Sequence, residues 1–400
     1  MANNRDTLIT GIGLVSSLGE GVDAHWRALN TAPFTPTLDI ETFAPYVVHP
    51  IVRLELDKQI PKRGDQRTME PWQRIGTYAA GLALDSAGIK DNAELLDHTD
   101  MIIAAGGGER DYAVDATILS TLPGTADPGV KLNEMLMSDL RPTLFLAQLS
   151  NLLAGNISVV HGVVGASRTF MGEEAAGVDA VRIAIARIAD GTSDLVLVGG
   201  SYNAERPDIL LHYEIGRVLW KKPYVSIAQR IASGGGMLLG SVGCFLVLES
   251  RAHAARRGAP AVACIAGIQS DRCNRAPGAA SVNAQRQFDT LMAGRDMGGA
   301  AIISGASGAG PASAEEAIFL RDLNLPVRNL PIRTPANALG HSLEPSFPAN
   351  LAIAAMSVSR GQIFAPLDAA EVTADEKLRS AIVTAWGHWR GEGMALVTAA

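Results

Sequence analysis

Short, uninterrupted apolar runs are the sequence feature that most restricts the fold of this chain. Residues 194–200 read DLVLVGG, and residues 100–108 read DMIIAAGGG. Runs of this kind are typical of strands that are buried on both faces, as in a largely parallel sheet. Other segments, such as 70–89, carry apolar residues at helical spacing. This alternation of strands and helices predicts an α/β fold.

The same patterns predict most of the other elements. We expect further strands at 8–16, 243–250, 260–268, 381–387 and 393–399, and helices at 21–29, 145–162 and between Gly172 and Gly191. Ser313 and Glu316 have the spacing of a capping box, which predicts that a helix begins there. Residues 121–141 read as a looser region. The Gly11-x-Gly13 pair lacks the third glycine of a dinucleotide fingerprint, so close packing is the preferred interpretation.

Composition excludes several classes of protein. The chain has 400 residues, of which 47% are hydrophobic and 19% charged, and its net charge is −7. An acidic chain without a basic face is a poor candidate for binding nucleic acid. No secretory signal and no apolar run of membrane-spanning length is present, so we expect no membrane insertion and a cytoplasmic location. Three cysteines are too few for a disulfide framework, and no Cys/His spacing resembles a zinc site. We expect no metal and no cofactor.

A predicted strand-to-helix turn carries two adjacent carboxylates. Residues 170–180 read FMGEEAAGVDA, so that Glu173 and Glu174 stand where the helix begins. Turns of this type are a favoured place for a catalytic nucleophile. A carboxylate in the first turn also gains stability from the helix dipole, without any catalytic role. Both interpretations remain open from these residues alone.

Five segments, taken together and in order, resemble the β-ketoacyl-acyl-carrier-protein synthases, which are thiolase-like condensing enzymes. They are residues 9–29, 62–89, 151–167, 240–259 and 338–357, and the last contains the sequence ALGHSLEPSFPAN. The resemblance covers nearly the whole chain. It implies a thiolase-like α/β/α/β/α layered sandwich made of two similar halves, here 1–250 and 251–400.

The resemblance also assigns catalytic positions, and this chain departs from the family at most of them. The family uses a cysteine that carries the acyl chain as a thioester, together with two histidines that assist decarboxylation and stabilise the thioester oxygen. Glu174 stands at the cysteine position, Ala306 at the first histidine and His341 at the second. Ala336 stands where the family has a lysine. The glycine-rich loop that closes the family's acyl site reads Gly387-His388-Trp389-Arg390, and these four residues are the candidate substrate-binding positions.

These substitutions predict a charged pair in place of the nucleophile. We expect Glu174 to be ionised and paired with Arg390, with His341 as the competing partner, because a lone buried carboxylate is costly. Glu173 should point elsewhere. Cys273 has no helix start or histidine near it in the sequence and is a poor substitute nucleophile, while Cys244 and Cys264 fit core strands.

The resemblance leaves three functions to consider. The first is a non-condensing, chain-length-factor-like partner of an active synthase. The second is a malonyl-carrier-protein decarboxylase, against which the loss of a histidine at Ala306 counts. The third is a 3-oxoacyl-carrier-protein synthase with altered chemistry. The implied partners are an acyl carrier protein and either an active synthase subunit, in a heterodimer, or a second copy of this chain. The family pairs subunits through the strand that corresponds to residues 167–171.

Overall fold

A computed structural model describes residues 3–142, 144–324, 330–374 and 376–400. Its main sheet contains eleven strands, ten of which form a continuous path. In the order of that path they are β11 (Ile332–Arg333), β10 (Ala300–Ile303), β12 (Ser380–Trp386), β13 (Glu392–Thr398), β9 (Ala263–Asp271), β1 (Thr7–Ser16), β8 (Val242–Ser250), β6 (Leu195–Tyr202), β4 (Asp100–Ala104) and β5 (Ser167–Phe170). The short β2 (Gly19–Glu20) pairs with β1, and β3 (Val48–His49) pairs with β7 (Leu239–Gly240) in a separate small sheet.

The two ends of this path repeat the same pairing pattern. In the first half β4 is parallel to both β5 and β6, whereas β8 is antiparallel to β6 and to β1. In the second half β10 is parallel to both β11 and β12, whereas β13 is antiparallel to β12 and to β9. A short antiparallel pairing of β1 with β9 joins the halves. The chain is therefore a duplicated α/β unit, and we propose its boundary between residues 250 and 251, where β8 ends.

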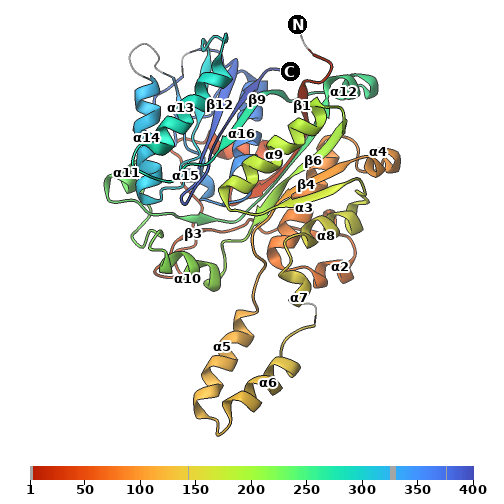
Figure 1. Ribbon diagram of the computed structural model, residues 1–400, viewed down its shortest axis with the longest axis vertical. Helices are drawn as coiled ribbons and strands as arrows, with labels where there is room; N and C mark the ends of the chain where they lie inside the picture. The colour runs from red at the N-terminus through yellow and green to blue at the C-terminus, as the bar shows by residue number, and fades with distance from the viewer. Residues whose placement is uncertain (1–2, 143, 325–329, 375) are drawn as a thin grey trace.

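Helices complete a five-layer arrangement (Figure 1). Two central helices, α9 (Glu174–Ala189) and α16 (Ser346–Arg360), contact each other and the strands of both halves. Outer helices α3 (Pro71–Ser86) and α8 (Leu152–His161) cover the first half, and α13 (Ala279–Met292) and α14 (Gly310–Asn324) belong to the second. The largest apolar core lies around the central helices. The predicted thiolase-like layered fold is confirmed.

Smaller helices lie at the edges of these layers. They are α1 (Gly21–Leu29), α2 (Arg63–Thr68), α4 (Ala93–Asp97), α7 (Leu144–Ala147), α10 (Pro207–Ile215), α11 (Ile227–Ala232), α12 (Arg251–Arg257) and α15 (Ala336–Leu339), with 3-10 turns at Leu56–Lys58 and Leu122–Gly124. Across the described residues, no helix is both long and apolar enough to cross a membrane.

Close packing explains the Gly11-x-Gly13 pair, as predicted. A Cβ atom at Gly13 would lie 1.9 Å from the carbonyl oxygen of Ala79 in α3, and one at Gly11 would lie 2.4 Å from the carbonyl oxygen of Ala83. Only glycine lets β1 approach the helix backbone so closely. The pair therefore has a packing role between strand and helix.

Two local predictions are wrong. Residues 121–141 are not loose, because α6 (Pro128–Ser138) follows α5 (Tyr112–Thr121), and Asp111 and Asp127 cap the two helices through their side chains. Ser313 does not open α14, which begins at Gly310; its hydroxyl instead accepts a hydrogen bond from the amide of Gly308. The caps at Asp111 and Asp127 were the sequence signal for α5 and α6. The alanine- and glycine-rich segment before Ser313 is helical from Gly310 onward, so α14 begins three residues earlier than predicted.

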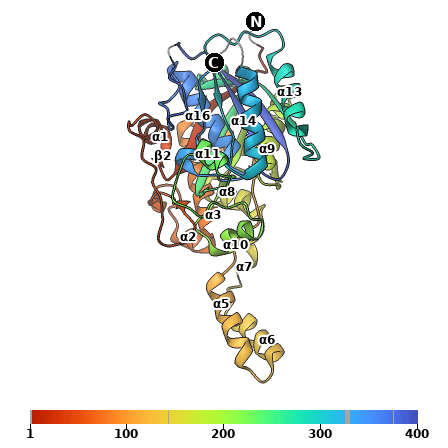
Figure 2. The ribbon, with the colours of Figure 1, turned by 90° about the vertical axis from the view of Figure 1, so that its left-hand side faces the viewer.

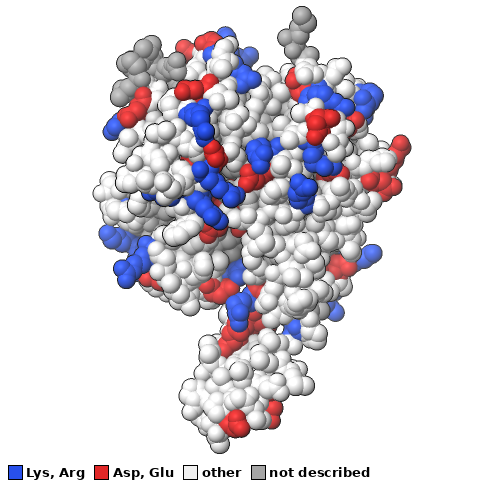
Figure 3. All heavy atoms as spheres, viewed as in Figure 1, with Lys and Arg blue, Asp and Glu red and all other residues white. Residues whose placement is uncertain are grey.

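Helices α5 and α6 form an arm that projects from the layered body (Figures 1 and 2). Several of its large apolar side chains are exposed, among them Leu119, Val130, Leu136 and Met137, the last with 79% of its surface accessible. Figure 3 shows that most of the visible surface of the arm carries no charged side chain. An apolar projection of this kind is typical of an interaction surface.

Candidate functional site

The turn between β5 and α9 has an unusual backbone. Gly172 has φ 131°, and Glu173 has φ 57° and ψ −134°, which a residue with a side chain rarely adopts. A conformation of this kind costs on the order of 1–3 kcal/mol and is found mainly at functional sites. The turn places Glu174 as the first residue of α9, where the partial positive charge of the helix N-terminus favours an anion.

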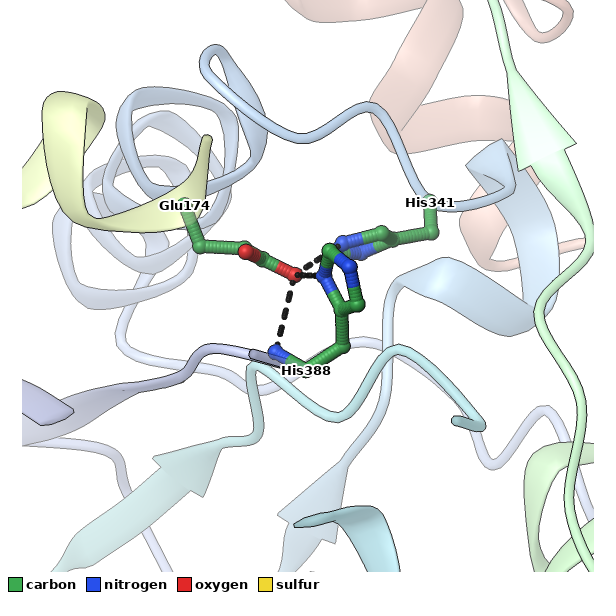
Figure 4. Close-up of side chains that lie close together, drawn as sticks. All are labelled: Glu174, His341 and His388. Atoms are coloured by element: carbon green, nitrogen blue, oxygen red, sulfur yellow. Dashed lines mark hydrogen bonds and ion pairs between the residues drawn. The ribbon is translucent and has the colours of Figure 1, made fainter. Parts of the chain in front are cut away.

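Two histidines hold the Glu174 carboxylate (Figure 4). His341 Nε2 and His388 Nδ1 each lie 2.8 Å from Glu174 Oε1, and the backbone N–H of His388 donates to the same oxygen at 3.2 Å. The side chains of Glu174, His341 and His388 are 5%, 2% and 7% exposed. We call these three residues the Glu–His–His clasp. They come from the start of α9, the turn after α15 and the connection between β12 and β13.

The connection between β12 and β13 is a tight loop that fits against α9. The amide of Gly387 donates to the carbonyl of Gly391 at 2.9 Å, and Gly391 has φ 91°. A Cβ atom at Gly391 would lie 3.1 Å from Cβ of Ala175. The guanidinium of Arg275 donates to the carbonyls of Gly387 and Trp389. These contacts fix the loop so that the imidazole of His388 faces the helix start.

The charges of the clasp support one another. Burial alone would raise the pKa of Glu174, but the two imidazoles hold it well below the usual value, with His388 the stronger influence. Burial opposes the protonation of His388, yet the nearby carboxylates of Glu174 and Glu173 raise its pKa above the usual value. Glu174 is thus an anion, and His388 is biased toward the imidazolium form.

Glu173 does not point away from the site, which corrects the prediction. Its Oε2 lies 3.8 Å from His388 Nε2, and its Oε1 accepts a hydrogen bond from the hydroxyl of Tyr213 at 3.3 Å. The rings of Tyr213 and His388 meet edge to face with centroids 5.7 Å apart. His388 therefore lies between two carboxylates and is packed against an aromatic ring.

The predicted pairing of Glu174 with Arg390 is wrong. Arg390 is exposed, and so is Trp389, whose side chain is 70% accessible. The tight turn of the loop directs His388 inward and the next two residues outward. The competing partner, His341, does contact Glu174. The sequence contained the signal for His388, because it is the other basic residue of the same loop.

Ala306 and Ala336 do not take part in the contacts of the clasp. Ala306 follows β10 and is buried, and Ala336 opens α15. Ala306 lines a cavity of about 810 Å³ together with Ile227 and Asn337. Neither alanine brings a hydrogen-bonding side chain to the clasp.

A smaller cavity, of about 270 Å³, lies next to the strained turn. Glu173, Tyr202, Arg206, Tyr213 and Glu344 are among the side chains that line it. Burial raises the pKa of Glu344 to about 8, so this carboxyl is mostly uncharged at neutral pH. Sequence patterns did not predict that Tyr213 and Glu344 lie at this site. Glu344 had one signal, since it is an acidic residue in an otherwise uncharged segment after His341.

The three cysteines offer no substitute nucleophile. Cys244 is fully buried in β8 and Cys264 is buried in β9. Cys273 follows β9, with its sulfur 3.7 Å from Glu392 Oε1. Burial raises the pKa of all three thiols, which disfavours the reactive thiolate. A carboxylate has no sulfur atom and cannot hold an acyl chain as a thioester, so Glu174 cannot replace a nucleophilic cysteine directly.

Curated proteins similar to this chain include a putative β-ketoacyl synthase named for a polyketide and a nodulation protein. The oxytetracycline polyketide putative β-ketoacyl synthase 1 of Streptomyces rimosus is 26% identical over 378 residues, which is 90% of this chain and 86% of that protein. Nodulation protein E of Rhizobium leguminosarum bv. trifolii is 28% identical over 271 residues, or 66% of this chain. That second match spans 63% of the relative, less than two thirds of its length.

Solved structures share the fold over nearly the whole chain. The ishigamide ketosynthase/chain length factor matches with a TM-score of 0.77 at 19% identity, covering 99% of both chains. A complex described as AntDE:AntF, a type II polyketide synthase acyl-carrier protein with its ketosynthase bound to the hexaketide, matches with a TM-score of 0.75 at 16% identity. It covers 99% of this chain and 100% of the other.

The family model for the β-ketoacyl synthase N-terminal domain matches residues 4–254, which is more than half of the chain. This match contains β1 through β8 and the turn that presents Glu174. Together with the layered fold, it shows that the chain belongs to the β-ketoacyl synthase family.

Proposed function

We propose that this protein is a non-condensing subunit, similar to a chain-length factor, that pairs with an active ketosynthase in fatty acid or polyketide synthesis. The observation that carries the proposal is the Glu–His–His clasp. At the helix start where the family resemblance assigns a nucleophilic cysteine, Glu174 is fixed by His341 and His388. A buried carboxylate with two hydrogen-bond partners is a stable structural element and a poor nucleophile.

The surroundings of the clasp favour a structural role. The adjacent cavity of about 270 Å³ lies below the usual size of ligand pockets, roughly 300–1,000 Å³. Its lining includes Arg206, Glu173 and Glu344, whose polar groups are unfavourable neighbours for an acyl chain. This site is therefore better suited to keep the start of α9 in place than to hold a fatty acyl intermediate.

An open sheet edge supports pairing with a second subunit. β5 is the last strand of the main sheet, and on its inner side Ala166 and Phe170 accept hydrogen bonds from Met101 in β4 and from Ala105 directly after it. Because alternate residues of a parallel strand bond to opposite sides, the backbone groups of Thr169 point away from β4. An unpaired edge favours the addition of another strand. Exposed Met171 and Val164 lie within three residues of β5 in the sequence.

The proposed partners follow from these surfaces. One is a ketosynthase-fold subunit that carries the cysteine, docked along β5 with the apolar α5–α6 arm reaching over it. A second copy of this chain would use the same edge. The other is an acyl carrier protein, which the AntDE:AntF complex contains with its ketosynthase. We place these partners, and this chain, in the cytoplasm.

Intact-protein mass spectrometry tests the missing nucleophile. The purified chain is incubated with an acyl-carrier protein charged with a thioester, and then with malonyl-carrier protein. We expect no acyl adduct on the protein and no β-ketoacyl product. An adduct on the wild-type chain, or turnover on the order of 1 per second, would show a functional condensing enzyme and would overturn the proposal.

Two variants of one residue test the edge. Thr169→Pro removes the outward N–H of β5 and should abolish association with the co-expressed ketosynthase, as measured by co-purification and light scattering. Thr169→Ala keeps this N–H and should associate like the wild type. Equal association of both variants would contradict pairing through β5.

A malonyl-carrier-protein decarboxylase is the second candidate. The observation in its favour is that two imidazoles, those of His341 and His388, converge on one point. Both are engaged by Glu174, so we expect no catalysis. The test measures the release of carbon dioxide from malonyl-carrier protein. Release that is lost in His341→Ala, but kept in the control His98→Ala at an exposed histidine, would favour the decarboxylase instead.

A further inference from the structure

The clasp has the composition of a metal site as well as that of a charge pair. One ligand atom from each of Glu174, His341 and His388 can be chosen so that all three lie within 4.8 Å of one another. The side chains approach from three separate elements, and the two imidazoles converge on one oxygen of Glu174 (Figure 4). A carboxylate oxygen and two imidazole nitrogens are ligands that zinc and other divalent transition metals prefer.

The present distances are close to those of a coordinated ion. Zinc binds nitrogen and oxygen at about 2.0–2.2 Å, so tetrahedral ligand atoms lie roughly 3.3 Å apart. The two nitrogen atoms are now each 2.8 Å from Glu174 Oε1. An ion therefore needs each imidazole nitrogen to move about half an ångström away from the carboxylate oxygen, and the two nitrogens, which lie within 4.8 Å of each other, to reach the same spacing. Three protein ligands also leave a coordination position for water or another ligand.

The surroundings of the clasp support the ligands. Glu173 Oε2 lies 3.8 Å from His388 Nε2, on the side of the ring that faces away from Glu174. A carboxylate behind a ligating histidine orients the ring and strengthens its binding to a metal. The Tyr213 ring packs against the same imidazole and limits its rotation. The burial of all three ligand side chains excludes bulk water from the site.

We infer that Glu174, His341 and His388 bind one divalent transition-metal ion, with zinc as the first candidate. In the bound state each histidine presents a nitrogen lone pair to the ion in place of its hydrogen bond to Glu174. The ion joins the start of α9 to the β12–β13 loop and to the turn after α15. The inference does not rest on the proposed partner function, because it concerns the isolated chain.

The test measures zinc binding by the purified, metal-stripped chain. Isothermal titration and elemental analysis after dialysis should give one zinc ion per chain, with a dissociation constant in the micromolar range or tighter. His388→Ala and Glu174→Ala should weaken binding more than about 100-fold, and Glu173→Gln about 10-fold, because it removes only the supporting carboxylate. His98→Ala, which removes an exposed histidine, should bind like the wild type.

Cobalt gives a spectroscopic readout of the metal site itself. Co²⁺ bound to nitrogen and oxygen in a site of low coordination absorbs visible light, and zinc should bleach this absorption. We expect the band in the wild type and in His98→Ala, and none in folded His388→Ala, with folding checked by circular dichroism. If the wild type retains no more zinc than His388→Ala, or shows no cobalt band, the clasp is a charge pair alone and the inference is wrong.

Discussion

Removal of the Glu174 carboxylate should destabilise the protein strongly, although the residue has no catalytic role in our account. Glu174→Ala deletes the acceptor of three hydrogen bonds, two from imidazoles at 2.8 Å and one from the His388 amide at 3.2 Å. Loss of one partner from a buried ion pair costs about 3–5 kcal/mol, because the other charge stays buried. For a 400-residue chain this corresponds to a fall of roughly 4–6 °C in Tm.

Glu174→Gln separates the loss of charge from the loss of side-chain volume, and Arg390→Ala tests the pairing that the sequence predicted. Glu174→Gln keeps an acceptor oxygen but loses the charge, and hydrogen bonds to a neutral group are weaker by about 1 kcal/mol each, so for the three bonds we expect a cost of about 3 kcal/mol. Arg390→Ala should change stability by less than about 0.5 kcal/mol, because this side chain is exposed. Differential scanning calorimetry at pH 6 measures all three. A cost below about 1 kcal/mol for Glu174→Ala, or a larger cost for Arg390→Ala, would refute the clasp.

Three other expectations follow from the same contacts. His388 has a raised pKa and Glu174 a lowered one, so the stability that they contribute should be full between about pH 4.5 and 6.5. It should fade as the pH rises through the folded-state pKa of His388 and as the pH falls through that of Glu174. The stability difference between wild type and His388→Gln should therefore be smaller at pH 9 than at pH 6, and a difference independent of pH would contradict this expectation. Glu174→Cys should accept an acyl group slowly at most and make no β-ketoacyl product, because Ala306 supplies no imidazole; product formation by this single variant in a mass-spectrometric assay would count against the account. Gly13→Ala should cost about 3 kcal/mol, since its Cβ would lie 1.9 Å from a backbone oxygen of α3, whereas Gly64→Ala, with open space around it, should be near neutral in thermal unfolding.

The buried parts of the fold were predictable because their patterns are local. The continuous apolar run at 194–200 is β6, and the helical spacing after Gly172 is α9. The Gly11-x-Gly13 pair also follows from local chemistry, as glycine in a buried strand marks a close backbone approach. The α5–α6 arm was missed, because its helices leave large apolar residues exposed and so lack an amphipathic pattern against the body.

The partners of Glu174 depended on geometry that sequence patterns do not contain. His341 and His388 lie 167 and 214 positions from Glu174. The family resemblance predicted that the loop 387–390 lies near the helix start. The choice of Arg390 within that loop rested on charge complementarity alone. The turn at Gly387 and Gly391 decides which side chain faces inward, and it selects His388. The same separation in sequence explains why no ligand spacing indicated a metal.

The central claim is that this chain contributes structure, and its partner contributes the chemistry. The most direct measurement is product formation by the complex of this chain with a cysteine-bearing ketosynthase, with one substitution in either subunit. We predict that alanine in place of the partner's nucleophilic cysteine abolishes the β-ketoacyl product, while Glu174→Gln in this chain leaves an assembled, active complex. Continued product formation without the partner's cysteine would contradict the account.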